Sequence, residues 1–160
     1  GEMLFQSKNL WVIMDMIKGR PERPSYIDGR LPYVDPQLRH FDPALPKFPT
    51  EDEYNEGSFD SLKVHPTYYD TDYNRHVNNI SYIVWLMESF PYEYLDHNLP
   101  EFFDVEWKKQ CHLGDEIRVE TKKKENSEEY YTKILRKCED GSEEIAFHGI
   151  TRWKKRVLDK

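Results

Sequence analysis

The sequence predicts an α+β fold in which a curved antiparallel sheet wraps around one long central helix. Three observations lead to this expectation. An apolar run at residues 80–87 has the spacing of a buried helix. From residue 103 onward, apolar and polar side chains alternate with a period of two, as in half-buried strands. Short polar turns such as Asp140-Gly141 separate these strands, so we expect neighbouring strands to be antiparallel.

The helix is expected to begin after a polar turn at residues 70–79, where Asn78 or Asn79 is a good N-cap. Because the run 80–87 is apolar on nearly every side, we expect the helix to be buried all round. Pro91 either interrupts the helix or starts a second helical turn.

One strand is expected before the helix and four after it. The first covers residues 61–69 and contains Pro66, which indicates an edge strand or a bulge. The other four are marked by alternation or by the turns between them, and they cover residues 103–107, 117–121, 130–138 and 145–153. The most economical arrangement of these elements is the hot-dog fold, a curved sheet wrapped around one helix.

The N-terminal part of the chain is predicted to lie outside this fold. Seven of the ten prolines fall between residues 21 and 49, so we expect a Pro-rich linker at residues 21–58. Residues 1–20 contain the short apolar run 10–14, which is typical of a single buried strand. A lone strand is unstable and needs a sheet from elsewhere. The folded unit is then expected at residues 59–160.

Composition excludes several classes of protein. The chain has 160 residues with 30 acidic and 23 basic side chains, and its formal charge of −7 disfavours binding to nucleic acid. No run approaches the roughly 20 apolar residues of a membrane span, and no secretory signal opens the chain. Two cysteines do not make a disulfide framework. We therefore expect a cytoplasmic protein with neither a membrane nor a nucleic acid as partner.

The turn at residues 70–79 is the densest group of polar side chains, with carboxylates, amides and one imidazole at a helix N-terminus. Free backbone N–H groups at such an end polarise a carbonyl and hold an oxyanion. A carboxylate can attack the carbonyl or activate water, and an imidazole moves protons near neutral pH. The set suits acyl transfer or hydrolysis. Taken singly, each residue is also an ordinary cap or turn former, so a structural role is the alternative.

Two motifs of the chain resemble those of a known family. The first is D-T-D-Y-N-R-H-V-N-N at residues 70–79, followed by Tyr82, Trp85 and Glu88-Ser89, and the second is W-K-K-Q-C at residues 107–111. Both are similar to motifs of the acyl-ACP thioesterases of plants and bacteria. Members of that family have two hot-dog domains. The resemblance implies that residues 1–20 are the last strand of a truncated first domain and that residues 59–160 are the second domain.

The resemblance also implies the catalytic residues. Asp72 is expected to act as general base for water or as nucleophile, with Asn74 holding the water or the carboxylate. His76 is expected to orient the site or to protonate the leaving thiolate. Gln110 stands where the family usually has a glutamate, and since an amide cannot accept a proton we expect it to be a polar wall. Cys111 matches a family cysteine proposed as nucleophile, and the alternative is a packed strand residue.

Three further residues are expected to contact substrate. Backbone N–H groups around Val77 and Asn78 are expected to form the oxyanion hole, and Trp85 is either an acyl contact or a core residue. We expect no metal, because the histidines lack the spacing of metal ligands, and no cofactor.

The resemblance implies that a free fatty acid is released from acyl carrier protein, whose phosphopantetheine arm holds the acyl chain. The basic runs at residues 122–124, 136–137 and 152–156 are either solvated strand faces or a docking patch for this acidic carrier. An acyl-CoA thioesterase and a non-catalytic acyl-binding or assembly module are the alternatives. Because a single hot-dog unit leaves a sheet edge open, we expect a homodimer.

Overall fold

The structure is a computed structural model of the 160-residue chain, and it describes residues 7, 9, 13–15, 17–18, 20–22, 48, 50–59 and 61–157. The chain divides into two compact units, Gly1–Lys47 and Phe48–Lys160.

In the first unit, β1 (Ile13–Asp15) pairs antiparallel with β2 (Arg20–Glu22). The Asp15 carboxylate accepts hydrogen bonds from the backbone N–H groups of Ile17 and Lys18 at 2.9 and 3.0 Å, which fixes the turn between the strands. The sequence predicts one strand that ends here, whereas the chain turns back into a second strand. Residues 10–12 and most of the predicted linker lie outside the described residues.

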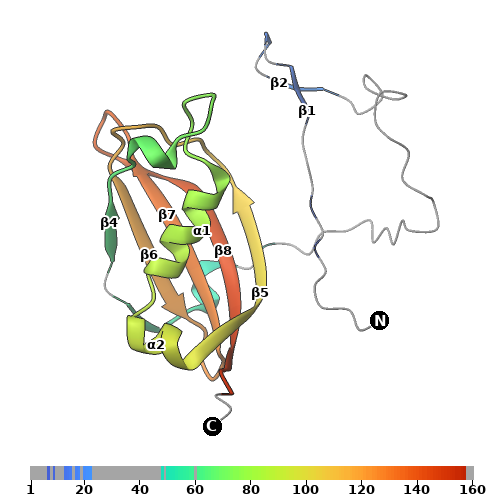
Figure 1. Cartoon of the computed structure of the whole chain (residues 1–160), viewed down its shortest axis with the longest axis vertical. Helices are drawn as coiled ribbons and strands as arrows, with labels where there is room; N and C mark the ends of the chain where they lie inside the picture. Colours follow the sequence, from blue (N-terminus) through green and yellow to red (C-terminus); the bar gives the residue numbers. More distant parts are fainter. Residues whose placement is uncertain are drawn as a thin grey trace, which may run out of the picture. The chain divides into compact units, whose positions relative to one another are not determined.

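The second unit is a sheet of antiparallel strands with one helix lying across one face (Figure 1). Its elements in chain order are β3 (Glu56–Ser58), β4 (Leu62–Val64), α1 (Asn79–Glu88), α2 (Tyr92–His97), β5 (Asn98–Trp107), β6 (Ile117–Lys123), β7 (Glu129–Lys137) and β8 (Glu143–Lys155). The strand order is β3-β6-β7-β8-β5, and β4 also pairs with β6. This is the hot-dog arrangement that the sequence predicts.

The hydrophobic core lies between α1 and the face of the sheet that it covers. Tyr82 and Leu86 from the helix belong to one buried cluster with Ile134 and Phe147 from the central strands. Gly149 of β8 faces this cluster, and a Cβ atom there would lie 2.9 Å from Leu86 Cδ1. The helix can therefore approach the sheet this closely only because position 149 has no side chain.

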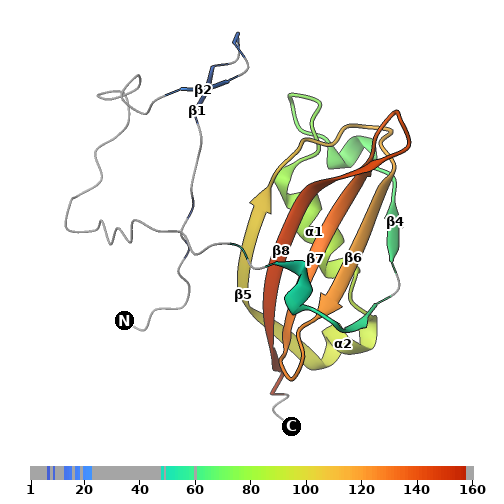
Figure 2. The ribbon, with the colours of Figure 1, turned by 180° about the vertical axis from the view of Figure 1, so that it is seen from behind.

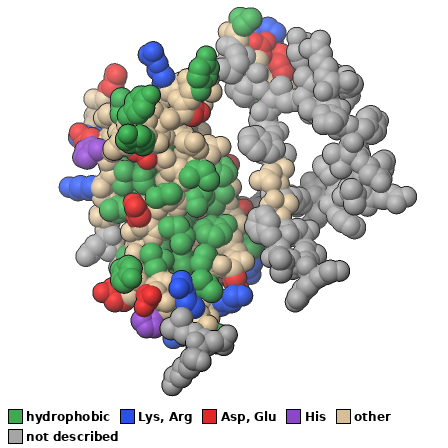
Figure 3. Space-filling model, viewed as in Figure 1, with side chains coloured by type: hydrophobic (Ala, Val, Ile, Leu, Met, Phe, Trp, Pro, Cys, Tyr) green, Lys and Arg blue, Asp and Glu red, His purple; other side chains and the backbone are tan. Residues whose placement is uncertain are grey.

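α1 is not buried all round, which corrects the expectation from its composition. Ile80 is 66% exposed and Val84 is 45% exposed, whereas Tyr82 and Leu86 are buried. Hydrophobic side chains gather over α1 and the neighbouring edge strand (Figure 3). We call the half-exposed set Ile80, Val84, Phe103 and Trp107 the α1–β5 apolar face.

The strand before the helix is shorter than predicted. β4 ends at Val64, before Pro66, and the chain continues through a 3₁₀ turn at Tyr68–Asp70. The Thr67 backbone N–H and hydroxyl both donate to the Asp70 carboxylate at 2.7 Å. Partial burial raises the pKa of Asp70, but these hydrogen bonds outweigh it and leave that pKa below its ordinary value. Asp70 is thus a cap that sets the start of the following loop.

The folded unit begins at Phe48, earlier than the predicted boundary at residue 59. A short 3₁₀ turn at Glu51–Glu53 lies over the face of the sheet opposite α1 (Figure 2). Glu51 accepts hydrogen bonds from Lys122 at 2.5 Å and from Lys133 at 2.9 Å. The Phe48 ring stacks on His148 with a 3.9 Å centroid separation. These contacts hold Phe48 and the turn at residues 51–53 onto the sheet, where the sequence predicts linker.

Candidate active site

Two loops meet at the N-terminal end of α1. The loop at residues 71–77 closes on itself through the bridge between Thr71 and Val77, and it pairs with the next segment through the bridge between His76 and His112. The Asp72 N–H donates to the His76 carbonyl at 2.7 Å, and the Val77 N–H donates to the Cys111 carbonyl at 2.8 Å. The result is a small antiparallel ladder of three short segments.

The ladder sorts the candidate residues onto two sides. Residues directly opposite in antiparallel segments share a side, and successive residues alternate. Asp72, His76 and His112 therefore form one row, which is exposed or half-exposed. Val77 and Cys111 occupy the other side, where both are buried in the core. We call Asp72, His76 and His112 the polar row.

The Asp72 carboxylate is held in place by the loop that it closes. Its Oδ1 atom accepts hydrogen bonds from the backbone N–H groups of Asn74 at 2.8 Å and His76 at 3.1 Å. Arg75, between them, has a left-handed φ of 63°, which makes the turn tight. Oδ2 of Asp72 has no hydrogen-bond partner among residues 61–157. One carboxylate oxygen is thus fixed by the loop, while the other remains open to a substrate or a water molecule.

Two imidazoles lie beside each other in the polar row. The rings of His76 and His112 have centroids 5.3 Å apart and meet edge to face. The Asp115 carboxylate accepts a hydrogen bond from the His112 backbone N–H at 2.8 Å and lies 4.0 Å from His112 Nδ1. The site therefore contains a second histidine and a second carboxylate beside the residues that the motif predicts.

Gln110 lies on the segment that carries His112, and its side chain is exposed. Its backbone carbonyl accepts a 2.7 Å hydrogen bond from Arg136 of β7. Arg136 also pairs with Glu144 and lies 3.9 Å from the Asp115 carboxylate. The guanidinium thus ties the segment at residues 110–115 to the sheet, which holds Gln110 and His112 near the loop.

Cys111 has the environment of a packed residue. It is fully buried, and its backbone N–H donates to the Tyr82 hydroxyl at 2.9 Å. Burial raises the pKa of the Cys111 thiol, which disfavours the thiolate that a nucleophile needs. The thiol also belongs to the buried side of the ladder, away from both histidines. These contacts favour the packed-residue interpretation over the nucleophile.

Replacing Cys111 with alanine is expected to leave turnover unchanged, because the thiol lies on the core side of the ladder. The loss of a buried sulfur should lower the free energy of unfolding by about 1 kcal/mol. Initial rates of the thioester hydrolysis that the family resemblance implies, together with urea unfolding curves, check the two expectations. If Cys111→Ala abolishes turnover while the unfolding curve is barely changed, the thiol is the nucleophile and this interpretation is wrong.

The backbone donors expected for the oxyanion hole already have partners. The Val77 N–H donates to the Cys111 carbonyl, and the Asn78 N–H donates to the Asp70 carbonyl at 2.7 Å. The Asn78 side chain accepts from the Ile80 N–H at 3.0 Å, so Asn78 is the N-cap of α1. It is one of the two residues that the sequence predicts for this role. Among the described residues, the Asn79 N–H has no acceptor, so it is the first free donor of the helix.

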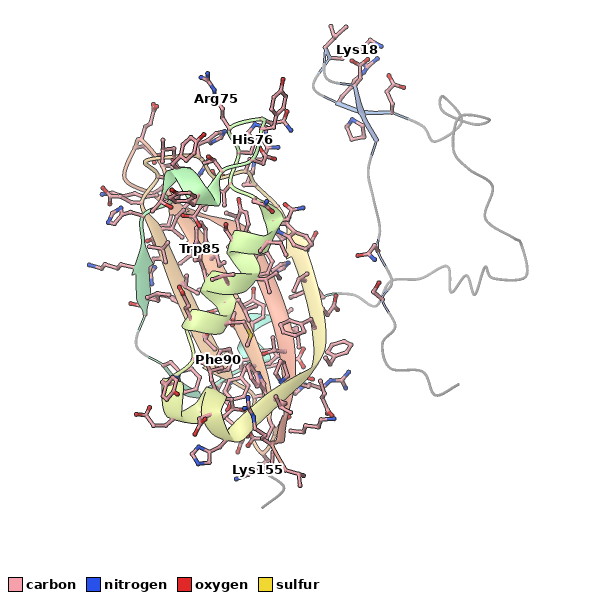
Figure 4. All side chains as sticks on the ribbon, viewed as in Figure 1. Lys18, Arg75, His76, Trp85, Phe90 and Lys155 are labelled. Atoms are coloured by element: carbon pink, nitrogen blue, oxygen red, sulfur yellow. The ribbon has the colours of Figure 1, made fainter. Side chains whose placement is uncertain are left out.

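Trp85 lies on α1, away from the loop that carries His76; both residues are labelled in Figure 4. It is 4% exposed and belongs to the core cluster. Its ring lies 5.5 Å from the Tyr82 ring. These contacts favour the core interpretation of Trp85 over the acyl contact.

Most of the basic runs are neutralised within the sheet. Lys122 pairs with Glu51, Lys124 pairs with Glu53 and Glu129, and Lys137 pairs with Glu116. Lys155 lies at the end of the sheet opposite Arg75 and His76 (Figure 4). These contacts favour solvated strand faces over a docking patch for the runs at residues 122–124 and 152–156. Arg136 of the run 136–137 lies beside the loop, but it is paired with Glu144 and donates to the Gln110 carbonyl.

The sequence reasoning did not assign His112, Asp115 or Arg136 to this site. His112 follows Gln110 by two positions, so the alternation of an extended segment places both on one side. The sequence contains this alternation, but it contains no local signal that the segment pairs with the loop at residues 71–77. In the described part of the chain, no group of three or more His, Cys, Asp or Glu residues is arranged to hold a metal ion. Nor is any helix of the described residues long and apolar enough to cross a membrane.

Comparison with known proteins identifies the family. The family model described as the acyl-ACP thioesterase C-terminal domain matches residues 53–155. The chain belongs to the acyl-ACP thioesterase family. Among its relatives, the oleoyl-acyl carrier protein thioesterase 2 of Arabidopsis thaliana is 28% identical over 134 residues, which cover 71% of this chain and 35% of the relative. The palmitoyl-acyl carrier protein thioesterase of Gossypium hirsutum is 28% identical over 96% of this chain and 39% of its own length. Both relatives are named as chloroplastic.

Solved structures of acyl-ACP thioesterases share the fold. The 12:0-ACP thioesterase from Umbellularia californica aligns with a TM-score of 0.63 at 19% identity, over 89% of this chain and 53% of that one. An acyl-ACP thioesterase from Bacteroides thetaiotaomicron aligns with a TM-score of 0.60 at 18% identity, over 88% and 53% of the two chains. The chain spans between a third and two fifths of the length of the curated relatives described above.

Proposed function

We propose that this domain carries the catalytic centre of a thioester hydrolase that releases a free fatty acid from acyl carrier protein. The observation that supports this most is the polar row, in which the open Oδ2 of Asp72 lies with two imidazoles beside the N-terminus of α1. The relatives that share the domain are named as thioesterases or hydrolases of acyl carrier protein substrates.

In the proposed reaction, Asp72 takes a proton from a water molecule that attacks the thioester carbonyl carbon. Asn74, whose side chain is exposed beside Asp72, holds that water. The Asn79 N–H and the positive end of α1 stabilise the oxyanion. His76, whose backbone is hydrogen-bonded to Asp72 on both sides, keeps the loop in register. Gln110 forms hydrogen bonds at the edge of the site but takes no proton.

Acyl carrier protein is proposed as the partner on the basis of surface charge as well as of the named relatives. Arg75 is exposed at the tip of the loop, and Lys109 is exposed on the segment opposite. Arg75 lies beside the polar row and would attract an acidic carrier as its arm enters, whereas Lys109 is already paired with Glu144 at 3.9 Å.

Initial rates with one acyl chain on two carriers test the proposal. Acyl-ACP should be hydrolysed with a higher kcat/KM than the matching acyl-CoA. A preference for acyl-CoA would favour the acyl-CoA thioesterase instead. Binding of the acyl chain without turnover of either thioester would contradict the enzyme and favour an acyl-binding module.

We also propose that the domain assembles with a second copy through the α1–β5 apolar face. Within residues 61–157, β5 pairs with β8 on one side only, so its other edge can extend the sheet. Trp107 is half-exposed on this edge strand and Val84 is half-exposed on α1, and the proposed contact would cover both side chains.

Light scattering coupled to gel filtration should therefore find a dimer. Val84→Lys, which places a charge on the apolar face, should shift the protein toward monomer. Val157→Lys, at an exposed position beyond β8, should leave the dimer intact. A stable wild-type monomer at the same concentration would contradict the proposed assembly.

The proposed location is the cytoplasm. The support for it is that both cysteines, Cys111 and Cys138, are free.

A further inference from the structure

His112 lies where a second proton-transfer group would be useful. The bridge between His76 and His112 places both rings on the exposed side of the ladder, together with Asp72. The His112 side chain is 49% exposed, whereas His76 is less exposed and has its backbone bonded to Asp72. Of the two imidazoles, His112 is thus the one open to a group that arrives from solvent.

Hydrolysis of a thioester creates a thiolate. The direction from which the thioester enters the site decides which residue lies next to the sulfur atom. The acyl chain is apolar and the thiol belongs to a long arm that leads back to the carrier in solvent. The sulfur therefore faces the solvent side of the polar row. We infer that His112 is a catalytic residue that protonates the leaving thiolate, an assignment that rests on the proposed thioesterase function.

Asp115 and Arg136 act as positioning residues for this imidazole. Asp115 accepts from the His112 backbone N–H at 2.8 Å and lies 4.0 Å from Nδ1. Arg136 lies 3.9 Å from the Asp115 carboxylate and donates to the Gln110 carbonyl at 2.7 Å. The segment is therefore fixed from both sides, which lowers the entropic cost of aiming the His112 ring.

The protons balance in this scheme. Water adds to the carbonyl carbon and gives one proton to Asp72, and the carbon–sulfur bond breaks as the tetrahedral intermediate collapses. The His112 imidazolium gives its proton to the departing sulfur. The proton on Asp72 then passes to solvent, and neutral His112 takes one up from solvent. The products are one carboxylic acid and one thiol.

The test compares two leaving groups on one acyl chain. A pantetheine thioester releases an alkyl thiolate, which is basic and needs a proton, whereas a thiophenyl ester releases an aryl thiolate that leaves unprotonated. His112→Gln keeps a polar side chain at this exposed position but cannot donate a proton as an acid. We expect kcat for the pantetheine ester to fall about 100-fold, while kcat for the thiophenyl ester stays near that of the wild type.

His97→Gln is the matched control, because His97 is an exposed histidine on α2, remote from the loop (Figure 1). It should change neither rate. An equal loss of both rates in His112→Gln, or no loss of either, would overturn the assignment, since a structural role does not distinguish leaving groups. If the wild type hydrolyses neither ester, the proposed function itself fails, and the assignment falls with it.

Discussion

Asp72→Asn is expected to lower the turnover of acyl-ACP by about 10²–10⁴-fold, the usual contribution of a general acid or base. Asparagine has nearly the same shape as aspartate and keeps the Oδ1 acceptor for the N–H groups of Asn74 and His76. The loop should therefore retain its conformation. The amide nitrogen that replaces Oδ2 cannot accept a proton from water, so only the chemical step should be affected.

Initial rates at saturating acyl-ACP measure this effect, and thermal unfolding shows whether the fold is kept. Asp140→Asn is the matched control, because Asp140 closes the β7–β8 turn in the same way, with its carboxylate accepting from the Ser142 N–H at 2.9 Å. The control should keep full turnover. If Asp72→Asn hydrolyses acyl-ACP at the wild-type rate, Asp72 is not the base.

Trp85→Ala is expected to lower the free energy of unfolding by about 3–5 kcal/mol, the usual cost of deleting a large buried aromatic side chain. Trp85 is almost wholly buried, and its cluster includes Leu86 and Phe147. The cavity left by the indole cannot collapse fully, because the sheet on one side is held by its hydrogen bonds. Urea unfolding measures the change, and Tyr92→Ala, at an exposed position on α2, should have little effect.

A milder substitution separates the core role of Trp85 from an acyl contact. Trp85→Phe keeps an aromatic ring and should leave the preference among acyl-chain lengths unchanged, because the indole packs in the core rather than on substrate. The ratio of kcat/KM values for a short and a long acyl-ACP measures that preference. A shift in this ratio, with stability close to wild type, would assign Trp85 to the acyl-binding surface.

Local patterns in the sequence predicted the framework of the fold. The turns before β7 and β8 were readable because they need left-handed residues, and Asn126 and Gly141 have φ values of 53° and 84°. The alternation from residue 103 predicted β5, but this strand begins at Asn98, directly after α2. Its first residues include Pro100, beside which the register shifts. Pro100 interrupts the alternation of apolar and polar residues, so the pattern does not predict the first residues of β5. The structure accommodates this proline because β5 is an edge strand.

Contacts between distant segments were not predictable in this way. Nothing in the apolar run of α1 distinguishes Ile80 from Leu86, and only the position of the sheet decides which is covered. The attachment of Phe48 to His148 joins residues 100 positions apart. Such pairs depend on the completed sheet, so neither segment carries a local signal for them.

In the candidate site, too, short-range contacts were predictable from the sequence and long-range contacts were not. The loop geometry of Asp72 and the cap at Asn78 are short-range hydrogen bonds, which sequence reasoning handles well. The pairing of His76 with His112 links two loops and was missed. The same pairing sends the Cys111 thiol to the core side, which spacing along the chain does not reveal.

The central claim is that the polar row does the chemistry and the buried side of the ladder does not. Its most direct test is a single comparison of kcat for Asp72→Asn and Cys111→Ala, each against the wild type, on the same acyl-ACP. The polar row predicts a loss of at least about 100-fold for Asp72→Asn and wild-type turnover for Cys111→Ala. The reverse pattern, with Asp72→Asn active and Cys111→Ala inactive at matched stability, would contradict the account.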